Sequence, residues 1–72
     1  MTITLSNEEK TQIVESHKKN LMINRYNAFL TKIEENAKSS PDSATVASLN
    51  SQIAVIDAQI AALDEELATF SE

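Results

Sequence analysis

The chain has 72 residues, a formal net charge of −5, no cysteine and no glycine. This length is enough for one domain. The missing cysteine excludes disulfides and thiolate metal sites, and the missing glycine excludes glycine-rich phosphate loops. All six basic residues precede Ser39, whereas the residues from Ser39 onward carry six acids and no base, which argues against nucleic acid as a partner.

The chain begins with the alternating stretch Met1-Thr2-Ile3-Thr4-Leu5. Residues 1–6 are expected to form an N-terminal arm, either a loose terminus that packs on the first helix or a strand added to a partner's sheet edge. The stretch has no basic region and no long apolar region, so no secretory signal is expected. No uninterrupted apolar run approaches the roughly 20 residues that span a bilayer, which predicts a protein without a membrane segment.

The first helix is expected at residues 7–38. Ser6-Asn7-Glu8-Glu9 has the form of a capping box, and good helix formers follow until Ser39-Ser40-Pro41. Its apolar residues form two stripes that point in different directions, with the change near residues 20–24. Either the helix bends or shifts register there, or it stays straight and buries two faces; we favour the two faces.

Residues 39–42 are expected to form the turn. Pro41 disfavours helix at Ser40 and suits the first position of a new helix, with Ser40 as its N-cap. Asp42 is the alternative N-cap.

The second helix is expected at residues 43–70, where apolar residues recur at alternating steps of three and four. This heptad pattern consists of Val46, Leu49, Ile53, Ile56, Ile60, Leu63, Leu67 and Phe70, and it indicates a helix that packs against another helix. Two helices of similar length joined by a short turn predict an all-α fold, an antiparallel two-helix hairpin resembling a coiled coil. Facing residue numbers should add to roughly 80.

The intramolecular core is predicted from the large apolar residues of both helices. Its members are Tyr26, Phe29, Leu30, Ile33, Leu49, Ile53, Ile56, Ile60, Leu63 and Leu67.

The second helix has a further apolar face, because Ala47, Ala54, Ala61 and Ala68 also recur every seven residues. A hairpin on its own would carry charge there, so we expect a homo-oligomer, most simply a dimer that forms a four-helix bundle. Alanine could also fill this surface for its helix propensity alone. The predicted protein interface consists of Ile13, Leu21, Ala54, Val55, Ala58, Ala61 and Ala62.

Candidate chemistry is sparse. His17 has no carboxylate or second histidine at helical spacing, so a partly buried histidine or interface residue is expected rather than a metal ligand or base. The acidic clusters, such as Glu34-Glu35 and Asp64-Glu65-Glu66, are expected on solvated faces, because a hairpin offers no cleft for paired acid–base work. No catalytic residue, cofactor site, metal site or small-molecule substrate is predicted, and the protein is not expected to be an enzyme.

Two stretches carry a resemblance to a known class of proteins. They are Ile3 to Lys10, leading into Gln12-Ile13-Val14, and Leu49-Asn50-Ser51-Gln52-Ile53 through Leu63. Together they resemble short uncharacterised helical-hairpin proteins encoded by tailed bacteriophages, especially those of marine cyanobacteria. The resemblance implies a small viral protein in the host cytoplasm or the virion. It would be a structural or adaptor component of the particle or, alternatively, a regulator or inhibitor that binds a host protein.

Overall fold

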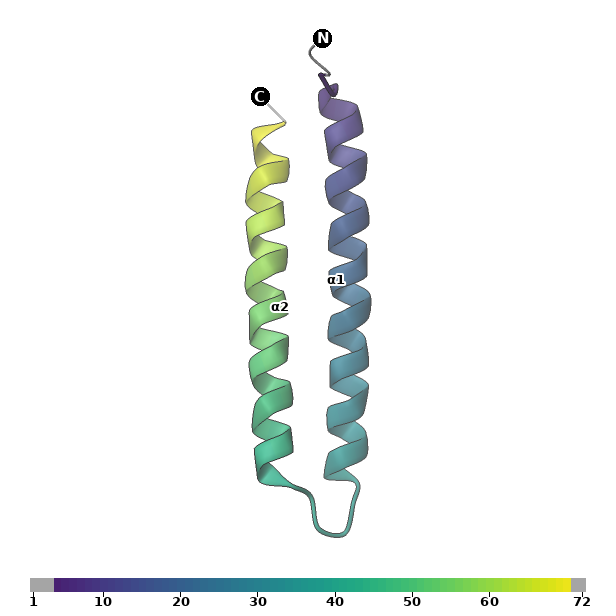
Figure 1. The fold of residues 1–72 in the computed structure, drawn as a ribbon, viewed down its shortest axis with the longest axis vertical. Helices are drawn as coiled ribbons and strands as arrows, with labels where there is room; N and C mark the ends of the chain where they lie inside the picture. Colours follow the sequence, from purple (N-terminus) through teal and green to yellow (C-terminus); the bar gives the residue numbers. More distant parts are fainter. Residues whose placement is uncertain (1–3, 71–72) are drawn as a thin grey trace.

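The computed structural model describes residues 4–70, which form an antiparallel hairpin of two α-helices (Figure 1). Helix α1 spans Asn7–Asn36 and helix α2 spans Ser43–Thr69. The molecule measures 59 × 21 × 15 Å, and the chain enters and leaves at the same end. The predicted all-α hairpin is therefore confirmed, while residues 1–3 of the predicted arm lie outside the described residues.

The start of α1 is fixed by the capping box. The Glu9 amide donates to the Ser6 hydroxyl at 3.1 Å, and the Ser6 amide donates to the Glu9 carboxylate at 3.0 Å. Two amides that have no partner within the helix are thereby satisfied. The same hydrogen bonds hold the pKa of Glu9 below its ordinary value, with the Ser6 amide as the largest cause.

The end of α1 comes two residues earlier than the sequence suggests. The helix ends at Asn36, and the Ala37 amide closes its last turn by donating to the Ile33 carbonyl at 3.0 Å. Lys38 therefore lies beyond the helix rather than within its last turn.

The start of α2 is fixed by Asp42. Its carboxylate accepts hydrogen bonds from the Ala44 amide at 3.0 Å and from the Thr45 hydroxyl at 3.1 Å. Asp42 is thus the N-cap, so the alternative reading of the turn is correct and the assignment of Ser40 is wrong. A carboxylate offers two acceptors and a negative charge at the positive helix end, which favours Asp42 over a hydroxyl.

Two ion pairs fix the register of the helices. Lys18 Nζ lies 2.7 Å from Asp64 Oδ1, and Arg25 Nε lies 2.6 Å from Asp57 Oδ1. The residue numbers add to 82 in both pairs. At the open end Lys10 Nζ lies 5.9 Å from the centre of the Phe70 ring, and those numbers add to 80. Facing positions therefore agree with the predicted register.

Candidate interaction surface

The face of α1 that meets α2 is unexpectedly polar. The less exposed positions of α1 recur at steps of three and four, as in a coiled coil, but lysine, arginine and threonine fill half of them. These positions are Thr11, Val14, Lys18, Leu21, Arg25, Ala28, Lys32 and Glu35, and Lys10 next to Thr11 is half-buried as well. The charged groups of two of these basic residues, Lys18 and Arg25, reach aspartates of α2.

The face of α2 that meets α1 is apolar throughout. Leu49 is buried, and the remaining predicted core positions of this helix are half-buried. These half-buried positions are Ile53, Ile56, Ile60, Leu63 and Leu67. Among residues 4–70, the buried apolar residues are Ala28, which is 9% exposed, and Leu49, which is 8% exposed. This is a small core for two helices of this length.

The large apolar residues of α1 point away from that core. Tyr26 is 60% exposed, Ile33 is 49% exposed, and Phe29 and Leu30 are also exposed. Their assignment to the intramolecular core is therefore wrong. The prediction followed residue size, whereas the hairpin turns a neighbouring set of positions toward α2, and this set includes Lys18 and Arg25.

Four exposed apolar residues of α1 form one row, which we call the α1 stripe: Met22, Tyr26, Phe29 and Ile33. At 100° per residue the row spans about 60° of the helix surface and lies about 90° from the face that meets α2. The Tyr26 and Phe29 rings stack with centres 6.4 Å apart and planes inclined by 29°. An exposed aromatic pair within a continuous apolar row is typical of an interaction surface.

The α1 stripe and the two ion pairs lie on the same broad side of the hairpin. Met22 and Phe29 are the helical neighbours of Arg25 at three and four residues, and Ala54 and Ala61 are those of Asp57. The offsets in sequence from Arg25 and from Asp57 are the same. In two antiparallel helices that face each other, equal offsets place residues on the same side of the hairpin, so Met22 and Phe29 lie on the same side as Ala54 and Ala61. This broad side therefore carries the α1 stripe, a row of alanines on α2, and the ion pairs between them.

The predicted interface residues are divided between several surfaces. Ile13, Ala54, Val55, Ala58, Ala61 and Ala62 are exposed. Leu21 is half-buried and shares an open hollow with Leu63 of α2, and its assignment to the protein interface stays a prediction. Leu21 occupies one of the α1 positions that meet α2.

The opposite broad side is hollowed around His17. An open hollow of about 430 Å³ is lined by His17, Asn20, Leu21, Gln59, Ala62 and Leu63. His17 is exposed, so the expectation of partial burial is wrong, while the alternative of an interface residue stays a prediction. The described residues contain no group of three or more histidine, cysteine, aspartate or glutamate side chains placed to hold a metal ion.

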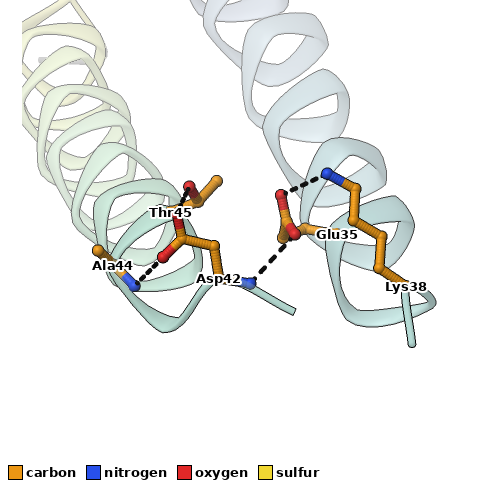
Figure 2. A network of polar contacts seen from close by, with 5 residues as sticks. All are labelled: Glu35, Lys38, Asp42, Ala44 and Thr45. Atoms are coloured by element: carbon orange, nitrogen blue, oxygen red, sulfur yellow. Dashed lines mark hydrogen bonds and ion pairs between the residues drawn. The ribbon is translucent and has the colours of Figure 1, made fainter. Parts of the chain in front are cut away.

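A buried carboxylate ties the turn to the end of α1 (Figure 2). Glu35 is 8% exposed, accepts a hydrogen bond from the Asp42 amide at 3.2 Å, and pairs with Lys38 Nζ at 3.1 Å. The Asp42 amide, followed by Lys38, holds the pKa of Glu35 below its ordinary value. The Ala44 amide and the Thr45 hydroxyl likewise lower the pKa of Asp42. The two carboxylates thus hold both sides of the turn.

By length and composition alone, α2 would suffice to cross a membrane. The prediction of no membrane segment rested on uninterrupted apolar runs, which serine and glutamine break. The average hydropathy of α2 is nevertheless high enough for a membrane span, because a few polar residues lower an average only slightly. The single helix carries little weight by itself, because helices of soluble proteins meet the same criterion.

Comparisons with protein-family models, with curated proteins and with solved structures found no match to this chain.

Proposed function

We propose that this chain is a non-enzymatic structural or adaptor protein that acts through helix packing and self-associates as a dimer. The observation that carries the proposal is the contrast between its buried and exposed apolar residues. Ala28 and Leu49 are buried, whereas Met22, Tyr26 and Phe29 are exposed on one helix. An apolar row of this kind is expected to be covered in the working state of the protein.

The small core of the single hairpin supports the same proposal. A chain of this size has a marginal core even when it is globular, and small helical proteins commonly gain stability by association. The α1–α2 contact leaves the core positions of α2, apart from Leu49, half-buried. Covering the exposed apolar residues with another helical surface would supply burial that the single hairpin lacks.

The proposed setting is a tailed bacteriophage, as the resemblance of the two sequence stretches implies. The protein would be a small component of the virion or a factor in the cytoplasm of the infected cell. The second candidate function is a regulator that binds a host protein through the same exposed residues.

Sedimentation equilibrium in detergent-free buffer tests the proposal. We expect a single species of twice the 7.9 kDa chain mass, unchanged in mass over a broad range of concentration. A chain that is monomeric at every concentration and has little helical circular dichroism by itself would contradict self-association and favour the regulator, which folds on its partner. A chain that stays in solution only with detergent or lipid would contradict both and favour a membrane role for α2.

A further inference from the structure

We infer that the α1 stripe is the contact with a second copy of this chain, arranged antiparallel about a twofold axis near residues 27 and 28. The inference rests on the proposed self-association and assigns its surface and register. A contact between identical surfaces must be self-complementary under a twofold rotation.

The spacing of the stripe has this symmetry. Met22, Tyr26, Phe29 and Ile33 follow one another at steps of four, three and four, which read the same in both directions. Two antiparallel copies can therefore place Met22 opposite Ile33 of the second copy and Tyr26 opposite Phe29 of the second copy. In both pairs the residue numbers add to 55.

The alanine row of α2 fits the same axis independently. Within one hairpin, facing residue numbers add to 80–82, as Lys10–Phe70 and Arg25–Asp57 show. The sum for facing α2 residues of the two copies is twice this number less the 55 of the α1 contact, which gives roughly 105–109. Ala54 opposite Ala54 of the second copy adds to 108. Ala47 opposite Ala61 of the second copy adds to 108 as well, so small residues meet where the second helices approach.

The angles fit a four-helix bundle. In a square bundle each helix meets two neighbours at directions about 90° apart. The α1 stripe lies about 90° around α1 from the face that meets α2. Each α1 would therefore contact its own α2 on one face and the second copy's α1 on the next.

The exposed area is of the size that such a contact needs. From the exposures of Met22, Tyr26, Phe29 and Ile33, which range from 41% to 60%, the stripe presents on the order of 400 Å² per copy. The alanine rows raise the total for two copies to about 1,200 Å², the lower end of the range for stable specific interfaces.

Charge at the ends of the stripe is also complementary. The last turn of α1 carries no basic residue, although its free carbonyls favour a positive charge. In the inferred register Lys19 lies opposite Asn36 of the second copy, at the end of that helix. Each copy would thus add a positive charge near the last turn of the other copy's α1.

Two alanine-to-cysteine variants test the surface. The chain has no cysteine, so each variant carries a single thiol. Ala54→Cys places it beside its own symmetry mate, while the matched control Ala62→Cys places it in the hollow on the opposite broad side. Under mild oxidation we expect Ala54→Cys to form a covalent dimer at least about tenfold faster than Ala62→Cys.

The outcomes separate the surface from the proposed function. Equal rates, or faster cross-linking of Ala62→Cys, while sedimentation still shows a dimer, would overturn the inferred surface and leave the proposed self-association intact. A monomeric mass for the unmodified chain at every concentration would overturn both.

Substitution of the stripe gives a second test that does not depend on disulfide geometry. Phe29→Glu should weaken self-association at least about tenfold, because a carboxylate would be buried in the contact. The control Val55→Glu adds the same charge at a residue that is 56% exposed outside the stripe, and should leave self-association unchanged. Comparable weakening in both variants, or in neither, would overturn the assignment.

Discussion

Replacement of Leu49 with alanine should destabilise the hairpin more than any other single truncation in α2. Leu49 is 8% exposed and lies near the turn, where the two helices are held in register. Burial of a leucine side chain contributes about 2 kcal/mol, and the cavity left behind adds to the loss. We therefore expect the free energy of unfolding to fall by about 2.5 kcal/mol, a large fraction of the stability of a chain this small.

The matched control is Val55→Ala in the same helix. Val55 is 56% exposed, so its truncation removes little buried area and gains helix propensity, for a net change within about 0.5 kcal/mol. Urea unfolding followed by circular dichroism, with all proteins at one concentration, gives both values. Equal losses in the two variants would refute the assignment of Leu49 to the core and of Val55 to the surface.

Three further predictions concern the turn and the register. Asp42→Ala should lower the thermal midpoint by about 5 °C, because α2 loses its N-cap, and thermal unfolding monitored by circular dichroism measures the change. Because the pKa of Glu35 is lowered in the folded state, the folded state binds fewer protons than the unfolded state. Ionised Glu35 therefore stabilises the fold above about pH 4.3, the ordinary pKa of a glutamate. This contribution is lost as the pH falls through the lower pKa of the folded state. Glu35→Gln should thus be less stable than wild type at neutral pH but not at low pH in urea titrations, with exposed Glu34→Gln as the control, and a difference that persists at low pH would contradict this role. Exchange of Arg25 and Asp57 should restore most of the stability that either single charge reversal removes, and a double-mutant cycle without coupling would argue against the observed register.

The α2 pattern made the hairpin predictable from sequence. Eight apolar residues at alternating steps of three and four specify a helix with one packed face, and Ser6 and Glu9 specify where α1 begins. Both patterns are local in sequence, so they can be recognised without knowledge of the helix that packs against them. The turn was predictable to the extent that proline and serine stop a helix, but the choice between Ser40 and Asp42 depended on geometry around the carboxylate.

The face of α1 could not be predicted from residue size. Lys18 and Arg25 occupy positions that meet α2, and a search for apolar periodicity passes over them. Their ion pairs with Asp64 and Asp57 could have indicated this face, because the residue numbers of both pairs add to 82 and therefore fit one register of the two helices. Apolar periodicity assigns Tyr26 and Phe29 to the core because hydrophobic residues are generally expected inside, although the structure exposes them in a continuous row.

The dependence of the urea midpoint on protein concentration tests the coupling of folding to self-association most directly. If the folded state is a dimer held by the α1 stripe, each tenfold increase in concentration should raise the apparent stability by about 1.4 kcal/mol and shift the midpoint upward. A midpoint that stays constant over a hundredfold range, for a chain that sedimentation shows to be monomeric, would contradict the account, because the single hairpin would then be stable with its apolar stripe in water.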